Sequence, residues 1–166
     1  MGKKFELTDK FIINVFGIKL FQIKCTKSFK YAQKGDLGGY VEKEGNLDQE
    51  NDAWVYGNAQ VSGDAQVSGD AQVSGNAWVY GNAQVYGDAN IKNNNEHCGF
   101  DGFGSCNRHT HAYLTKEKKV EITCGCFRGS IEEFEKKVEE THSGTIYEKQ
   151  YKAIINVIKI KFGLTD

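Results

Sequence analysis

Histidine and cysteine gather in one short segment, residues 97–111, and these side chains are the best suited to chemistry. The segment holds Cys98, Cys106, His109 and His111. Thiolate and imidazole are the ligands that structural zinc prefers. Such sites usually place their ligands in two tight pairs, and the spacing Cys98-x7-Cys106-x2-His109 contains none. We therefore predict a glycine-rich loop with ordinary thiols and no cofactor, and keep these four residues as an alternative zinc site.

Most of the middle of the chain is a six-residue repeat that must position everything else. From Gly57 to Lys92 it reads GNAQVS, GDAQVS, GDAQVS, GNAWVY, GNAQVY and GDANIK. An alanine and, two residues later, a valine or isoleucine recur in every hexad, and this period of two is typical of a strand. Glycine and then aspartate or asparagine follow, as corners require. Each hexad is therefore predicted to be a short strand plus a turn.

A hexapeptide period predicts that such units stack as a parallel β-helix with three faces and about 18 residues per coil. The register extends back in a weaker form to Gly39, which gives about three coils. The uninterrupted period favours the left-handed form, and a right-handed helix is the alternative. So short a stack needs caps over its open strand edges. The predicted fold class is mainly β: a short parallel β-helix with an N-terminal β cap and a C-terminal ββαα cap.

Composition shifts divide the chain into four predicted parts. Strand-rich sequence with a tight turn at Gly17 precedes the repeat, and two capping boxes, Ser130 with Glu133 and Thr145 with Glu148, start two helices near the end. The parts are a β cap at 1–38, the repeat at 39–92, the Gly/Cys/His-rich loop at 93–111 and a ββαα module at 112–166.

Charge and hydropathy exclude several function classes. The net charge is −1, with +5 on residues 1–38 and −7 on residues 39–91, which does not favour nucleic acid or a membrane surface as a partner. The start of the chain, MGKKFELTDK, lacks the apolar run of a signal peptide. We expect a cytoplasmic protein whose five cysteines are mostly reduced.

Aromatic residues interrupt the repeat at outward positions. Trp54, Tyr56, Trp78, Tyr80 and Tyr86 take places that other hexads give to glutamine, asparagine or serine. Exposed Trp and Tyr side chains are good interface anchors, so these five are the predicted binding residues. Packing against a cap or a sister subunit is the alternative.

Enzymes that share a hexapeptide repeat are disfavoured. Their transferases use a histidine as general base, and residues 39–92 contain no histidine and no inserted loop. A Cys126–His109 nucleophilic pair is conceivable but nothing in the sequence fixes its geometry. We expect no catalysis, with a hexapeptide-repeat acyltransferase as the alternative.

The lead-in GDLGGYVEKEGNL at 35–47, the hexads, and GCFRGSIEEFEKKVEETH at 125–142 together resemble a large family of small phage and prophage proteins. The resemblance covers nearly the whole chain and implies phage origin and a β-helix, but no reaction. By analogy we expect a non-catalytic protein that inhibits a bacterial defence protein, or sequesters its nucleotide signal, in the host cytoplasm. A homo-oligomer, dimer or trimer, fits this expectation. A structural or assembly element of the virion is a further alternative.

Overall fold

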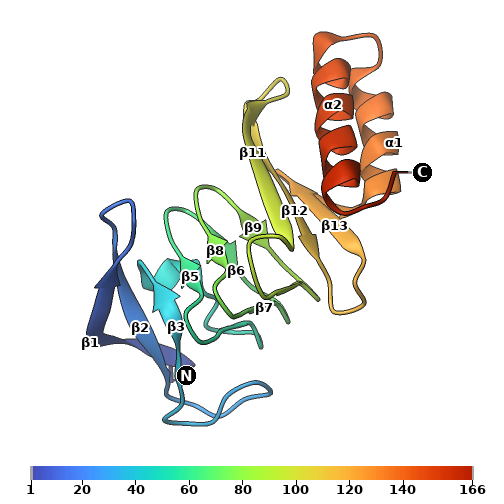
Figure 1. The fold of residues 1–166 in the computed structure, drawn as a ribbon. Helices are drawn as coiled ribbons and strands as arrows, with labels where there is room; N and C mark the ends of the chain where they lie inside the picture. The colour runs from blue at the N-terminus through green and yellow to red at the C-terminus, as the bar shows by residue number, and fades with distance from the viewer. Residues whose placement is uncertain (1, 166) are drawn as a thin grey trace. The chain divides into compact units, whose positions relative to one another are not determined.

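The computed structural model describes residues 2–165, and the chain divides into two compact units, Met1–Asn94 and Asn95–Asp166. The first unit contains the N-terminal strands and the hexads. The second contains four strands and two helices. Figure 1 shows the elements of each unit.

The first unit starts with an antiparallel hairpin. Strands β1 (Phe5–Ile13) and β2 (Lys19–Cys25) pair with each other, and β2 also pairs antiparallel with β3 (Leu37–Val41). Gly17 lies in the turn between β1 and β2 with φ of +77°, which confirms the predicted tight turn. A short 3-10 helix, η1 (Glu44–Asn46), follows β3.

Each hexad contributes a strand of two residues. These strands are β4 (Trp54–Val55), β5 (Gln60–Val61), β6 (Gln66–Val67), β7 (Gln72–Val73), β8 (Trp78–Val79), β9 (Gln84–Val85) and β10 (Asn90–Ile91). Each pairs in parallel with a strand 18 residues away: Trp54 lies beside Gln72, and Gln60 beside Trp78. The alanine and the aliphatic residue of each hexad are fully or almost fully buried, as expected for the inward side of a strand with a period of two.

The fold class predicted from the sequence is nevertheless wrong. Instead of a uniform parallel β-helix closed by separate caps, residues 2–165 form several small separate sheets and two C-terminal helices. The sheet orders are β1-β2-β3-β5-β8, β10-β7-β4, β6-β9 and β11-β12-β13-β14. The first sheet is mixed, because β3 pairs antiparallel with β2 and parallel with β5. The supposed cap and the first hexads therefore share one sheet, and the predicted boundary at 38/39 falls inside a strand.

Two glycines explain how β3 can serve both neighbours. A Cβ on Gly38 would lie 2.6 Å from the Val55 carbonyl oxygen, and one on Gly39 would lie 2.7 Å from that of Ala59. Real side chains do not reach such distances, so only glycine lets the backbone approach this closely. Gly38 and Gly39 of the lead-in are thus required by the close packing of β3 against Val55 and Ala59.

The second unit corrects the prediction for residues 93–111. Most of the expected loop is a hairpin of β11 (His97–Phe103) and β12 (Arg108–Leu114), continued antiparallel by β13 (Val120–Cys124) and β14 (Phe127–Ser130). Glycine is unfavourable in strands and hid this hairpin from the sequence pattern, but ladder pairing with β12 holds the segment extended.

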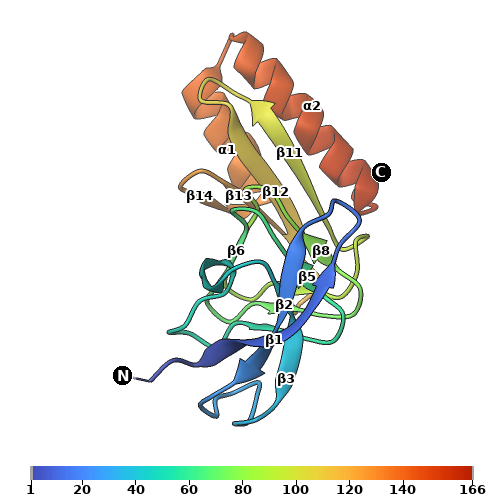
Figure 2. The same ribbon diagram turned by 90° about the vertical axis from the view of Figure 1, so that its left-hand side faces the viewer.

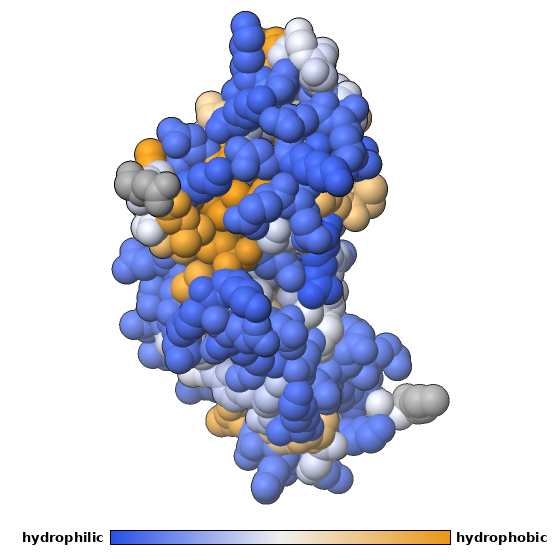
Figure 3. All heavy atoms as spheres, turned by 90° about the vertical axis from the view of Figure 1, so that its right-hand side faces the viewer, coloured by the Kyte–Doolittle hydropathy of each residue, from blue (hydrophilic) through white to orange (hydrophobic). Residues whose placement is uncertain are grey.

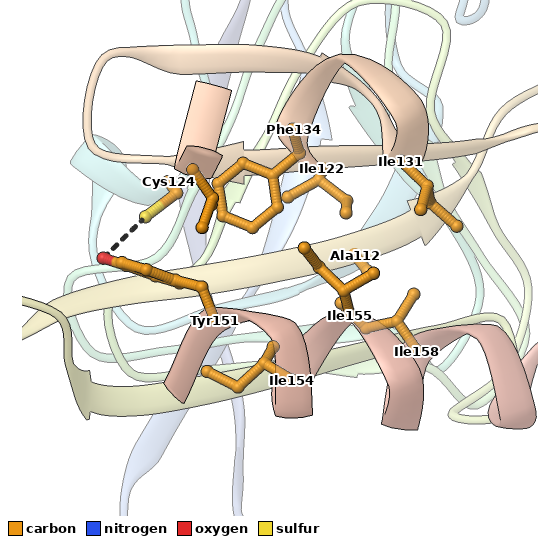
Figure 4. Packing of buried hydrophobic residues seen from close by; sticks show 10 residues of the cluster. Ala112, Ile122, Cys124, Ile131, Phe134, Tyr151, Ile154, Ile155 and Ile158 are labelled. Carbon is orange, nitrogen blue, oxygen red and sulfur yellow. Dashed lines mark hydrogen bonds between the residues drawn. The ribbon is translucent and has the colours of Figure 1, made fainter. Parts of the chain in front are cut away.

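Two helices complete the second unit, and both predicted starts are confirmed. Helix α1 (Ile131–His142) begins at Ser130 with a full capping box, and α2 (Ile146–Lys161) begins at Thr145, whose side chain accepts from the Glu148 amide. The two helices lie along one face of the four-stranded sheet (Figure 2). Their apolar stripes meet Ala112, Ile122 and Cys124 of that sheet in a buried core (Figure 4).

Candidate functional site

Trp54 is not a surface residue, and its prediction as an exposed interface anchor is wrong. Its side chain is only 1% exposed. The rings of Phe5 and Phe29 pack against it edge-on, with centroids 6.3 and 5.4 Å away. Segments from the N-terminal part of the chain therefore cover this aromatic position. Trp54 belongs to the core of the first unit.

The other predicted aromatic residues differ in exposure. Tyr56 is half-buried, and its hydroxyl donates to the Tyr31 carbonyl oxygen at 3.4 Å. Trp78 and Tyr86 are also half-buried. Tyr80 is 55% exposed and is the member of the set that offers most surface. The predicted five residues thus do not form one uniform binding face.

Tyr80 belongs to a group of exposed apolar side chains that the sequence analysis missed. Its ring lies 6.3 Å from that of Phe16 in the β1–β2 turn. Val15 and Phe16 are 72% and 66% exposed, and Phe11 and Ile13 of the adjoining strand are also exposed. We call Phe11, Ile13, Val15, Phe16 and Tyr80 the apolar tip.

A rigid turn presents this tip. The Asn14 side-chain oxygen accepts from the amides of Phe16 and Ile18 at 2.9 and 3.0 Å, and the Gly17 amide donates to the Asn14 carbonyl. Asn14 and Gly17 therefore occupy turn positions that favour asparagine and glycine. Val15 and Phe16 occupy positions that turns normally give to polar residues. That combination was the available sequence signal for the tip.

The tip is flanked by positive charge. The Lys19 ammonium lies over the Phe11 and Phe21 rings, 4.0 and 4.9 Å from their centroids. Such cation–π contacts hold a lysine against apolar surface while leaving its charge available. The tip therefore combines an apolar centre with one cationic edge.

Apolar side chains are also exposed in the second unit. Ile146, Val157, Ile160 and Leu164 are exposed along and just beyond α2. Spacings of 11 and 3 residues place Ile146, Val157 and Ile160 on the same side of α2, because 3.6 residues make one turn of a helix. On the face that Figure 3 draws, one larger apolar area and a few smaller ones lie among hydrophilic residues.

The second unit contains a row of hydrogen-bonded histidines. Asp101 bonds to His109 at 2.6 Å, His109 to His111 at 3.3 Å, and His111 to His97 at 3.2 Å. Burial lowers the pKa of His97 to about 4, with a smaller contribution from Lys161. Burial, and then the neighbouring His97 and His109, hold the pKa of His111 well below its usual value. Both rings are therefore neutral at pH 7.

Strand register explains this row. His97, Gly99 and Asp101 alternate along β11 and share a sheet face with His109 and His111 of β12. A Cβ on Gly99 would lie 2.7 Å from the His109 ring, so glycine makes room for the stacked imidazoles. The strand register and Gly99 together create this row of histidines in the hairpin.

The alternative zinc ligands do not come together. Cys98 packs with the helix-facing core, where burial raises the pKa of its thiol to about 11, and Cys106 is exposed in the β11–β12 turn. His109 and His111 lie in the histidine row. Among residues 2–165, no three His, Cys, Asp or Glu side chains are placed to hold one metal ion. The ring nitrogens instead bond to one another, which suits a structural network.

Comparison with known proteins gives no functional lead. No protein-family model matches this sequence. No curated protein is similar to it. Within the described part of the chain, neither helix has the length and apolar character needed to cross a membrane.

Proposed function

We propose that this chain is a non-catalytic binding protein that docks onto another protein through its apolar tip. The observation that carries the proposal is the placement of Val15 and Phe16 at the end of a rigid turn, where both side chains are mostly exposed. Exposing large apolar residues without a partner brings no stability. Contiguous apolar groups rimmed by polar residues mark interaction sites.

The size of the tip suits a small anchor. Full burial of one valine or phenylalanine side chain contributes about 1.5–3 kcal/mol. Val15 and Phe16 together can therefore supply the central part of an interface, with Tyr80 beside them as an aromatic of the type enriched in hot spots. Because Asn14 and Gly17 fix the turn, little conformational freedom is lost on docking.

The flanking charge indicates the partner's chemistry. Lys19 borders the apolar centre, so the complementary surface is an apolar pocket on a protein with an acidic group at its rim. On the resemblance to phage and prophage proteins, we further propose that the partner is a bacterial defence protein that the chain inhibits by direct contact in the host cytoplasm. A different route to the same inhibition, which we keep as the second candidate, is sequestration of a nucleotide signal.

The test compares capture of proteins from a bacterial host lysate by the wild-type chain and by a Val15→Ser/Phe16→Ser variant. Leu37→Ser is the matched control, because Leu37 is an exposed apolar residue of the same unit outside the tip. We expect a partner retained by the wild type and the control and lost by the tip variant. With that partner purified, the tip substitutions should raise Kd by about 100-fold or more.

Two results would overturn the proposal. One is a partner that binds the tip variant as tightly as the wild type. The other is the absence of any partner together with concentration-dependent dimers that the tip substitutions abolish, because the tip would then join copies of this chain.

A further inference from the structure

A pocket of about 120 Å³ opens in the second unit between the sheet and helices α1 and α2. It belongs to neither the apolar tip nor the histidine row. The lining residues that matter to the argument are Arg108, Phe127, Phe134, Lys137, His142 and Tyr151.

Aromatic rings form its walls. The Phe127 and Phe134 centroids lie 5.0 Å apart, and Tyr151 meets Phe134 edge-on at 5.6 Å. His142 stacks on Tyr151 with 29° between the ring planes. Flat rings in these offset and edge-on arrangements offer both a face and an edge to a further ring. The walls therefore suit a small aromatic group.

Two cationic side chains, Arg108 and Lys137, line the pocket. Arg108 lies across Gly125, where a Cβ would be 2.7 Å from a guanidinium nitrogen, so glycine allows the arginine to lie there. Lys137 lies on α1. Neither cation forms an ion pair with any residue of the described range 2–165. Both charges are thus available to an anion.

The lining contains no carboxylate among the described residues, which distinguishes this pocket from two other cavities. One of those includes Glu50 and Asp52, and the other includes Glu132. A carboxylate would compensate the cations or repel an anion. The electrostatics here favour a negatively charged ligand.

The Tyr151 hydroxyl is a buried polar group whose hydrogen-bond partner is weak. The residue is 5% exposed, and its hydroxyl lies 3.7 Å from the Cys124 sulfur (Figure 4). A thiol is a weak hydrogen-bond partner. Burial raises the pKa of Tyr151, so the phenol stays protonated and can donate. Gly104 also packs here, where a Cβ would overlap the hydroxyl.

We propose that this pocket binds a small aromatic anion. The flat ring lies among Phe127, Phe134 and His142, and the anionic group meets Arg108 and Lys137. The Tyr151 hydroxyl gives the ligand a further donor. An aryl phosphate and an aromatic carboxylate share this chemistry, and the experiment separates them.

The test uses phenyl phosphate and benzoate as probes, with inorganic phosphate and benzyl alcohol as the two half-ligands. Titrations are followed by NMR signals of the Tyr151 and His142 rings and by calorimetry. We expect saturable binding of at least one of the two aromatic anions, and binding about tenfold or more weaker for each half-ligand.

Substitutions test the residues. Arg108→Gln and Lys137→Gln should each weaken binding by about tenfold, because each removes a charge-assisted contact. Lys136→Gln is the matched control, since Lys136 is an exposed lysine next to Lys137 that does not line the pocket. Helical circular dichroism verifies folding of each variant.

Three outcomes overturn the proposal. Neither aromatic anion saturates; or inorganic phosphate binds as tightly as phenyl phosphate, so that the rings contribute nothing; or the Lys136 variant loses as much affinity as the Lys137 variant. The apolar tip lies in the other unit, so failure of the pocket proposal would not affect the docking proposal, which is tested separately.

Discussion

Two nearly identical stretches of this chain have different environments. Residues 52–61 read DAWVYGNAQV and residues 76–85 read NAWVYGNAQV. In the first copy the tryptophan is fully buried and the tyrosine half-buried. In the second copy the tryptophan is half-buried and the tyrosine mostly exposed beside Phe16. Identical residues at equivalent repeat positions therefore serve as core in one copy and as surface in the other.

The cause lies outside the repeat. The Lys4 ammonium donates to the carbonyl oxygens of Asn51 and Ala53 at 2.6 and 2.9 Å, which fastens the N-terminal segment beside the first copy. Phe5 and Phe29 then cover Trp54. At the second copy, the Phe16 ring of the β1–β2 turn lies 6.3 Å from the Tyr80 ring, and Trp78 stays half-buried. A repeat supplies equivalent positions, and the flanking segments decide which of them face water.

The largest effect should come from truncating the two tryptophans. We expect Trp54→Ala to lower the free energy of unfolding of the first unit by about 3–5 kcal/mol, because it leaves a cavity in the core. Trp78→Ala should lower it by about 1 kcal/mol. Urea unfolding followed by the remaining tryptophan measures both variants. Equal losses would contradict the difference in burial between the two copies.

Lowering the pH should destabilise the second unit more than the first. All four histidines lie in the second unit. The folded-state pKa of His97 is about 4, below the ordinary value of 6.5, so the unfolded chain binds more protons between these values. The stabilisation is complete above pH 6.5 and falls by about 3 kcal/mol as the pH drops toward 4.

Separate signals can follow this effect. Tryptophan fluorescence reports the first unit, which holds both tryptophans, and helical circular dichroism reports α1 and α2 of the second. Between pH 7 and 5 the helical signal should lose stability toward urea more steeply than the fluorescence. A His97→Gln variant should flatten that dependence. Parallel losses from both signals in the wild type would argue against the neutral histidine row.

Uncovering Trp54 should make the first copy resemble the second. In a Trp78→Phe background, Phe29→Ala should shift the Trp54 emission to the red and increase its quenching by acrylamide, with a stability loss of about 1 kcal/mol. Phe21→Ala is the control, because the Phe21 ring packs against Phe11, whereas the ring contacts of Trp54 are with Phe5 and Phe29. If both variants leave the emission unchanged, the proposed cover over Trp54 is incorrect.

The smallest effect concerns Phe16 and Tyr80 in the free protein. Their ring contact should give a coupling energy of about 0.5 kcal/mol in a double-mutant cycle of Phe16→Ala and Tyr80→Ala, because both rings remain largely hydrated. Chemical unfolding of the four proteins measures it. A coupling above about 2 kcal/mol would mean that Tyr80 is structural and unsuited to docking.

Features that depend on short stretches of sequence, such as repeat positions and helix caps, could be predicted. Burial of the alanine and valine positions and the helix starts at Ser130 and Thr145 follow from short-range patterns, and all are observed. The mixed sheet could not be predicted, because β3 pairs with partners both before and after it in sequence. The burial of Trp54 depends likewise on distant Phe5 and Phe29, and Arg108 joins its pocket only through the strand register.

The two tyrosines of the duplicated stretch give the most direct test of the central claim, that the exposed copy and the turn beside it form the docking surface. Tyr56→Ser and Tyr80→Ser change the same residue at equivalent positions. In capture from a host lysate, we expect Tyr80→Ser to weaken retention of the partner by about tenfold or more, and Tyr56→Ser to leave it near the wild-type level. Equal retention by the two variants would contradict the claim.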